Sequence, residues 1–221
     1  MIKIKICGIT RLEEVEYLNE EHVDYAGFVI YENSKRYITV ERAAAIAESL
    51  DPDIKKVAVT VSPDIELLKE IEANGFDIIQ VHKGLSNAVI DAATIPIWYA
   101  VNATDTGHMT MTLEWIRQLP IRLGAKIEAL VMDAPEFGSG QTFDWHKSKR
   151  MLKAGTLSPP TEDRLFTKKF VLAGGLTPEN VSEGIEIFNP DIVDVSSSVE
   201  GEDGKDKDKI SAFVNAVRSV G

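Results

Sequence analysis

Eight short apolar runs rich in valine and isoleucine alternate along the chain with segments that have the spacing of amphipathic helices. The apolar runs lie at Ile2–Cys7, Tyr25–Ile30, Lys56–Val61, Asp77–His82, Ile95–Val101, Ile127–Asp133, Lys169–Ala173 and Asp191–Ser196. The helical segments lie at Arg11–Asn19, Val40–Ser49, Pro63–Ala73, Asn87–Ala92, Leu113–Leu119, Trp145–Leu152, Pro178–Ile187 and Lys207–Val217. Strands that alternate with helices in this way run parallel, because each helix returns the chain to the same end of the sheet.

Eight such units can form either an open, doubly wound sheet or a closed (β/α)8 barrel. The count of eight and the length of 221 residues favour the barrel. A glycine-rich dinucleotide motif is missing after the first strand, which argues against the open sheet. We also find no shift in composition that would mark a linker. The sequence therefore predicts an α/β protein with one (β/α)8 TIM-barrel domain over residues 1–221.

Several helix boundaries carry local signals. Thr10 can cap a first helix that begins near Arg11. Pro63 and Pro178 each stand at the expected first position of a helix, where a missing N–H is tolerated. Gly75 follows the third helical segment as a stop.

Charge and cysteine content exclude several classes of function. The formal net charge of −11 argues against binding nucleic acid or an anionic membrane through a basic surface. A single cysteine allows no internal disulfide and no cysteine-based metal cluster, and the other ligand types lack metal spacing. No apolar run is long enough to span a bilayer, and Met1 leads directly into a strand. We expect a cytoplasmic protein without metal or cofactor.

Polar residues at the ends of the predicted strands are candidates for a site, because barrels place their chemistry at that mouth. Cys7, the only cysteine, ends the first strand, although cysteine is also common as a small buried apolar residue. Asp133 ends an apolar strand, where lost hydration raises the pKa of a carboxyl group and suits it to donate a proton. An ordinary turn aspartate is the alternative.

Two late loops have the features of a phosphate site. Gly174 and Gly175 precede a helix whose N-terminal N–H groups can bind an anion, and Ser196 and Ser197 follow the eighth strand. Barrels often bind phosphate between these two loops, but a tight turn and solvated serines explain the same residues.

Two further residues, one at the end of a predicted strand and one in the loop after a strand, each allow two interpretations. Arg36 can hold a carboxylate with two hydrogen bonds, or it can be a solvated loop arginine. His82 can take part in proton transfer, or it can be a packed histidine.

The run Lys5-Ile6-Cys7-Gly8-Ile9-Thr10, together with further segments, resembles the phosphoribosylanthranilate isomerase family of tryptophan biosynthesis. The further segments are Gly27-Phe28-Val29, Ser34-Lys35-Arg36-Tyr37-Ile38, Val57–Val61, Asp77–His82, Asp133, Gly138–Trp145, Leu172–Val181, Asp194–Glu200, Lys205-Asp206 and Lys209-Ile210. The resemblance runs in register over nearly the whole chain.

The resemblance implies a cofactor-free (β/α)8 barrel that converts an aminoaldose phosphate into an aminoketose phosphate by an Amadori rearrangement. Asp133 would be the general acid that protonates the furanose ring oxygen, and Cys7 the general base that removes the proton from C2 of the sugar. Arg36 would hold the anthranilate carboxylate, and Asp194 would contact the anthranilate side. The residues of the two late loops (Gly174, Gly175, Ser196 and Ser197) would bind phosphate, with His82 a further substrate contact.

This chemistry requires the pKa values of the Cys7 thiol and the Asp133 carboxyl group to approach each other. We expect neighbouring N–H donors to lower the pKa of Cys7 and burial to raise the pKa of Asp133. The partner would be a phosphorylated small molecule, and the protein a monomer or a homodimer.

Four positions depart from the family pattern near the expected ligand: Lys35, Lys83, Phe137 and Ser198. Ser198 replaces a usual glycine, and its bulk could disturb phosphate binding. A barrel that acts on another phosphosugar therefore remains an alternative, as does a barrel that binds a phosphorylated ligand without converting it.

Overall fold

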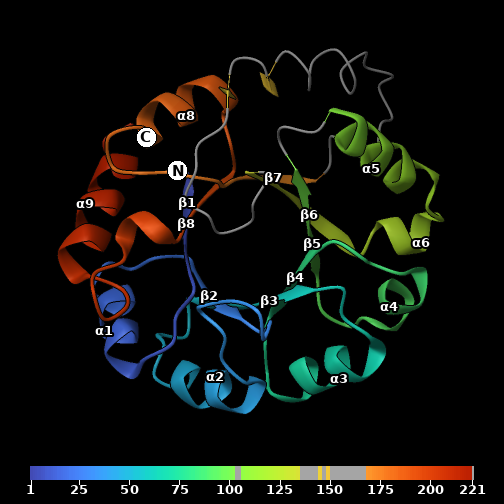
Figure 1. The fold of residues 1–221 in the computed structure, drawn as a ribbon, viewed down its shortest axis with the longest axis horizontal. Helices are drawn as coiled ribbons and strands as arrows, with labels where there is room; N and C mark the ends of the chain where they lie inside the picture. The colour runs from blue at the N-terminus through green and yellow to red at the C-terminus, as the bar shows by residue number, and fades with distance from the viewer. Residues whose placement is uncertain (103–105, 135–143, 146–147, 150–167, 221) are drawn as a thin grey trace.

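The computed structural model describes residues 1–102, 106–134, 144–145, 148–149 and 168–220. Parallel strands form a closed barrel, and helices surround it (Figure 1). The strands are β1 (Lys3–Cys7), β2 (Tyr25–Val29), β3 (Lys55–Val61), β4 (Ile78–His82), β5 (Ile97–Asn102), β6 (Ile127–Asp133), β7 (Lys169–Leu172) and β8 (Ile192–Val195). Each strand pairs with the next in the chain, and β8 pairs with β1 to close the barrel. The predicted (β/α)8 TIM-barrel fold is confirmed.

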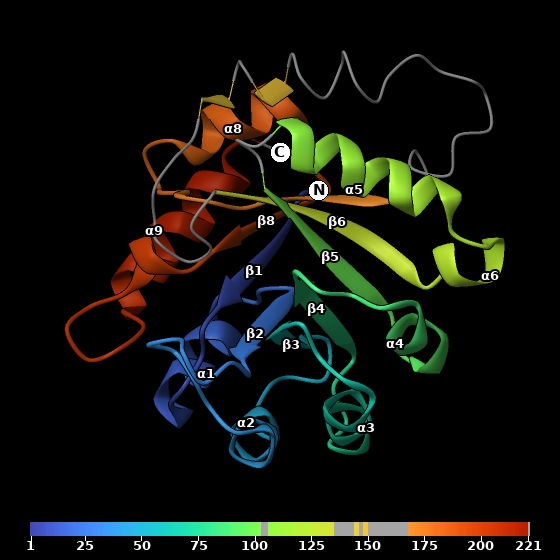
Figure 2. The same ribbon diagram turned by 45° about the vertical axis from the view of Figure 1, so that its right-hand side comes forward.

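The helices cover the outside of the strands (Figures 1 and 2). They are α1 (Leu12–Glu20), α2 (Val40–Ala47), α3 (Ile65–Ala73), α4 (Asn87–Ala92), α5 (Thr106–Gln118), α6 (Ile121–Gly124), α8 (Val181–Phe188), the 3-10 helix η2 (Ser197–Val199) and α9 (Lys207–Arg218). The predicted helix Trp145–Leu152 lies largely outside the described residues. Among the helices of the described ranges, none is long and apolar enough to cross a membrane.

Strand β1 is buried on both faces over most of its length. Ile4 and Ile6 pack toward the helices, whereas Cys7 belongs to the inner cluster of the barrel. Lys5 is fully buried as well. Apolar and charged residues alternate along this strand, yet Lys5 is buried, because alternate side chains of a barrel strand point to the interior rather than to water.

The inner cluster is filled below the mouth by large aromatic side chains. The rings of Tyr25 and Trp98 meet edge to face with centroids 4.9 Å apart, and the Trp98 indole N–H donates to Glu128 Oε2 at 2.9 Å. The barrel is therefore a packed core and not a channel.

Two helix starts differ from the sequence prediction. The backbone N–H of Thr10 donates to the Glu14 carboxylate at 2.7 Å, so Thr10 is not the cap of α1. At α3 the Asp64 side chain accepts from the backbone of Leu67 at 2.8 Å, and Pro63 precedes the helix. In both cases a carboxylate accepts hydrogen bonds from backbone N–H groups at the start of the helix.

Helix α5 begins earlier than predicted. The predicted helical segment begins at Leu113, whereas α5 begins at Thr106. The short helix α6, which follows Pro120, was not predicted. The first turns of α5 carry threonine, glycine and methionine without a clear apolar stripe, so their sequence gives little helical signal.

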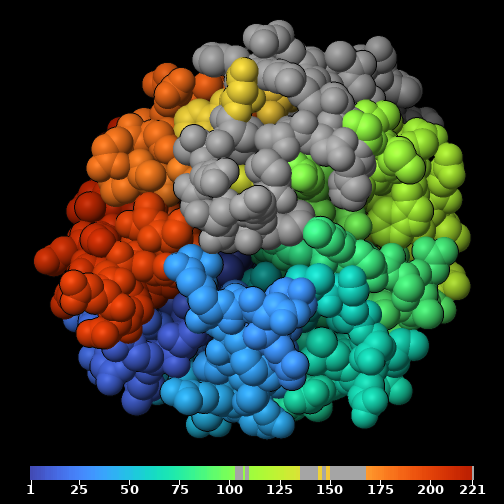
Figure 3. Space-filling view, in the orientation of Figure 1, coloured from blue at the N-terminus to red at the C-terminus, as the bar shows by residue number. Residues whose placement is uncertain are grey.

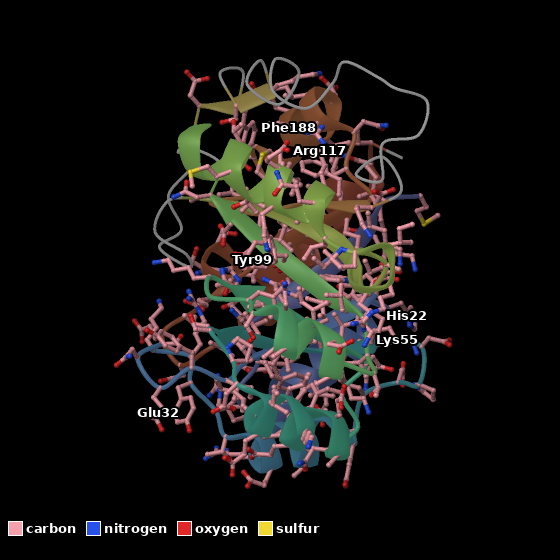
Figure 4. The ribbon with its side chains drawn as sticks, turned by 90° about the vertical axis from the view of Figure 1, so that its right-hand side faces the viewer. His22, Glu32, Lys55, Tyr99, Arg117 and Phe188 are labelled. Carbon is pink, nitrogen blue, oxygen red and sulfur yellow. The ribbon has the colours of Figure 1, made fainter. Side chains whose placement is uncertain are left out.

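The two ends of the barrel are distinct. Glu32, just after β2, lies at the opposite end of the molecule from His22, which precedes β2, and Lys55, which begins β3 (Figure 4). Since all strands are parallel, their C-terminal ends share the end marked by Glu32.

Candidate active site

A cavity of about 560 Å³ opens at the C-terminal mouth of the barrel. Its walls include all nine predicted site residues: Cys7, Arg36, His82, Asp133, Gly174, Gly175, Asp194, Ser196 and Ser197. Figure 3 shows the molecule hollowed at its centre in this view. The structure therefore brings together residues from β1, β4, β6, β8 and three loops around one space large enough for a small molecule.

Asp133, at the end of β6, is only 8% exposed. Burial raises the pKa of its carboxyl group to about 7, and the negative charge of Asp194 acts in the same direction. The backbone N–H of Ala134, which donates to Asp133 Oδ1 at 2.7 Å, and the positive charge of Lys5 oppose this. The predicted rise is confirmed, and the group can hold a proton near neutral pH.

Cys7 ends β1, three strands around the barrel from Asp133. Burial raises the pKa of its thiol. The positive charges of Lys5 and Lys205 lower it, and Asp194 raises it. The expected lowering of the Cys7 pKa is wrong, because loss of hydration outweighs the stabilisation that the neighbouring charges give to the thiolate.

Beneath the cavity, Lys5 Nζ lies 2.7 Å from Asp194 Oδ2. Burial disfavours the ammonium form of Lys5, but Asp194 and Cys7 raise its pKa above the usual value. Asp194 Oδ1 is buried and has no hydrogen-bond partner among the described residues. The sequence pattern did not identify Lys5 as a site residue. Its position two residues before Cys7 was the available signal, since residues i and i+2 of a strand share a face.

Arg36 is held against the cavity wall by an ion cluster centred on Glu200. Its Nε and Nη2 both bind the Glu200 carboxylate, and Lys35 and Lys205 each place Nζ 3.0 Å from a Glu200 oxygen. Burial would raise the pKa of Glu200, but the hydrogen bonds and charges of these cations lower it to about 2. Glu200 is thus ionised and fixes the guanidinium. The sequence pattern did not identify Glu200 or Lys205 as site residues.

His82 closes another side of the cavity at the end of β4. Burial, followed by the positive charges of Lys5 and Lys83, lowers the pKa of its imidazole to about 3. The ring is therefore neutral at neutral pH and acts as a hydrogen-bonding group, not as a cation. Its Nε2 lies 2.8 Å from Gln80 Nε2.

The turn after β7 is built on two consecutive glycines. Gly174 and Gly175 adopt φ angles of +84° and +66°, in the left-handed region that favours glycine. The Asn180 side chain fixes the turn, donating to the Gly175 carbonyl at 2.9 Å and accepting from the Thr177 N–H at 2.8 Å. Helix α8 begins only at Val181, so the prediction that Pro178 starts it is wrong.

Replacing Gly174 with alanine is expected to destabilise the protein and weaken the site. The new Cβ would lie 2.6 Å from the backbone nitrogen of Ala134, beside Asp133, on a residue with positive φ. Gly75→Ala is the matched control: Gly75 has φ of +74°, as a predicted helix stop should, but a Cβ there meets only Lys56 Nζ at 3.6 Å.

Thermal and urea unfolding should show a loss of about 1–3 kcal/mol for Gly75→Ala from backbone strain, and a larger loss for Gly174→Ala. Only Gly174→Ala should lower activity at temperatures where the protein stays folded. Equal losses of stability would show that the contact with Ala134 is not a constraint on this turn.

The family model for N-(5'-phosphoribosyl)anthranilate (PRA) isomerase matches residues 4–216. The chain belongs to this isomerase family. The N-(5'-phosphoribosyl)anthranilate isomerase of Streptococcus pneumoniae strain G54 is 36% identical over 219 residues, which cover 99% of this chain and 96% of the relative.

Solved structures of PRA isomerases have the same fold. The enzyme from Thermus thermophilus is similar with a TM-score of 0.80 and 26% identity, and each chain is covered completely. A PRA isomerase in complex with reduced 1-(o-carboxyphenylamino)-1-deoxyribulose 5-phosphate is similar with a TM-score of 0.77 and 31% identity. That alignment covers 99% of this chain and all of the other.

Three of the four residues that depart from the PRA isomerase pattern lie within the described part of the structure. Lys35 and Lys83 line the cavity, and Lys83 adopts a φ of +63°, in the left-handed region that favours glycine. Ser198 Oγ donates to the Leu176 carbonyl at 2.6 Å and so joins the two late loops. Phe137 lies outside the described residues. Within the described ranges, no group of three or more His, Cys, Asp and Glu side chains is arranged to hold a metal ion.

Proposed function

We propose that this chain converts N-(5'-phosphoribosyl)anthranilate into 1-(2-carboxyphenylamino)-1-deoxyribulose 5-phosphate, with Asp133 as general acid and Cys7 as general base. The observation that carries the proposal is the pairing of Asp133, whose pKa is raised to about 7, with the Cys7 thiol in one cavity. A proton donor and a proton acceptor on different strands around one cavity suit a reaction that protonates one atom and deprotonates another.

Ring opening is the first step, and Asp133 supplies its proton. The carboxyl proton passes to the furanose ring oxygen, the bond from that oxygen to C1 breaks, and the lone pair of the anthranilate nitrogen forms a C1=N double bond. The product is an open-chain Schiff base with a hydroxyl group where the ring oxygen was. Asp133 suits this step because its burial keeps a proton on the carboxyl group near neutral pH.

Proton removal from C2 is the second step, and the Cys7 thiolate carries it out. The electrons of the C2–H bond form a C1=C2 double bond, and those of the C=N bond return to nitrogen. The resulting enolamine becomes the ketone when C1 gains a proton and the C2 hydroxyl loses one. A thiol whose pKa lies above its ordinary range gives little thiolate at neutral pH, but that thiolate is a strong base.

Four groups would hold the substrate around these two residues. Arg36, fixed by Glu200, faces the cavity and suits the anthranilate carboxylate. The unpartnered Oδ1 of buried Asp194 suits the anthranilate N–H, which would satisfy it. The glycine turn at Gly174 and Gly175, together with Ser196 and Ser197 on the same cavity, suits the phosphate, and neutral His82 can hydrogen-bond a sugar hydroxyl.

The pH profile of kcat/KM is expected to be level in its middle and to fall on both sides. Below about pH 7 Asp133 is already protonated. Activity therefore follows the fraction of Cys7 that is thiolate, which increases about tenfold per pH unit. Between the two pKa values, the gain in thiolate cancels the loss of protonated Asp133. Above the pKa of Cys7 only the loss remains, and activity falls.

Steady-state rates measured across this pH range, in buffers of constant ionic strength, check the profile. A profile that is highest in acid, or one that keeps rising through the alkaline range, would contradict the assignment of the acid and the base.

Growth of a tryptophan auxotroph that lacks this isomerase tests the proposed function. The strain should grow without tryptophan when it expresses the wild-type chain, as it should with the Streptococcus pneumoniae relative as positive control. An empty vector sets the background, and immunoblotting confirms expression. Failure of a soluble, well-expressed chain to support growth would refute the proposal.

A further inference from the structure

Lys5 is a buried cation that the two proposed steps do not use. It lies on β1 two residues before Cys7 and is fully buried, whereas Lys3, two residues earlier on the same strand, is largely exposed. Its ammonium group makes an ion pair of 2.7 Å with Asp194 from the adjacent strand β8. A buried charge carries a large desolvation cost, so a lysine at this position calls for a physical reason.

The Lys5 ammonium group and the Cys7 thiol are neighbours in space. A Cβ atom built on Gly27, in the adjacent strand β2, would lie 2.9 Å from Cys7 Sγ and 3.1 Å from Lys5 Nζ. Both atoms thus lie beside the same point of the barrel wall. Glycine at position 27 leaves the space in which the two side chains approach each other.

The charges around Cys7 come from several elements. Lys5 acts on it from its own strand, Asp194 from β8 and Lys205 from the loop before α9. Across the barrel, Asp133 on β6 and His82 on β4 both interact with Lys5. Of the groups that act on the thiol, Lys5 has the largest effect that opposes burial.

We propose that Lys5 is a positioning residue for the base: its buried ammonium group holds a fixed positive charge beside Cys7 and stabilises the thiolate there. Asp194 keeps the ammonium group charged and in place. The inference rests on the proposed function, because that function gives the thiolate its task. A role limited to neutralising Asp194 is the competing explanation, and it requires no influence on Cys7.

Titration of the thiol in the substrate-free protein tests this role, and it separates the two explanations when Asp194 is neutralised as well, because an unpaired Asp194 charge would itself raise the pKa of Cys7. Cys7 is the only cysteine, so thiolate absorbance and the rate of alkylation by iodoacetamide report this residue alone. Lys5→Met should raise the midpoint of both titrations and reduce the thiolate at neutral pH at least about tenfold, which is one pKa unit. Lys3→Met, the same change on the exposed part of β1, is the matched control and should leave the midpoint unchanged.

The double variant Lys5→Met/Asp194→Asn keeps the test decisive if Lys5→Met does not fold. It removes both charges together and leaves no unpaired buried ion. Since Lys5 affects the thiol more than Asp194 does, the midpoint should still lie above that of the wild type. Circular dichroism and thermal unfolding verify the fold of each variant.

An unchanged or lowered midpoint in the folded double variant, or in folded Lys5→Met, would overturn the proposal. In turnover assays the alkaline limb of the pH profile should move upward with the thiol midpoint. The titration needs no substrate, so its result does not depend on the proposed function. Absence of isomerase activity would refute the proposed function, whereas an unchanged midpoint of the thiol titration would refute only the role of Lys5.

Discussion

Replacement of Cys7 by alanine is expected to lower kcat/KM for N-(5'-phosphoribosyl)anthranilate by about 10²–10⁴-fold, the usual contribution of a general base. The side chain lines the cavity at the end of β1 and is almost fully buried, so the substitution removes the base and little of the binding surface. The loss should therefore appear mainly in kcat. Steady-state kinetics of the purified variant check this.

Cys7→Ser is the control for shape. A hydroxyl group keeps nearly the size of the thiol, but it does not ionise in the accessible pH range, so the serine variant should be about as slow as the alanine variant. If either variant kept wild-type kcat, the thiol would not be the base, and the second step would need another group.

Replacement of Asp133 by asparagine is expected to reduce kcat by about 10²–10⁴-fold as well, because the amide cannot donate a proton to the ring oxygen. Asparagine has the shape of protonated aspartic acid, and its side-chain oxygen can still accept from the Ala134 backbone N–H. The fold should thus be preserved, which thermal unfolding verifies.

The pH profile of the Asp133→Asn variant distinguishes loss of the acid from a general disturbance of the site. With Asp133 replaced, the level region should disappear, and the remaining activity should rise with pH until Cys7 is fully ionised. A variant that kept the wild-type profile at reduced height would show that the limb near pH 7 belongs to another group.

The position of the site could be predicted from the sequence because the fold turns chain order into geometry. Once eight strands are recognised, parallel closure carries Cys7, His82, Asp133 and Asp194 to one mouth, and the structure places all of them on one cavity. The rise in the pKa of Asp133 followed from its place at the end of an apolar strand.

The charge environment of the site could not be predicted in the same way. The pKa of Cys7 depends on Lys5, Asp194 and Lys205, which come from β1, β8 and the loop before α9. Glu200 fixes Arg36 over a separation of 164 residues. Local patterns contain no information about such long-range pairs.

Helix ends show a related limit. Thr10 and Pro63 have the residue types of helix starts, but Glu14 and Asp64 satisfy the backbone N–H groups. Several residues near each end can serve as caps, and the choice depends on where packing places the first turn.

The most direct test of the account is NMR of N-(5'-phosphoribosyl)anthranilate incubated with the purified wild-type chain. We predict that the signals of furanose C1 and of the hydrogen on C2 disappear at a rate proportional to enzyme concentration, while a C2 ketone appears. Cys7→Ala and Asp133→Asn should slow this at least about 100-fold. The account would be contradicted if the substrate disappeared no faster with the folded wild-type chain than in buffer alone. It would also be contradicted if both variants converted the substrate as fast as the wild type.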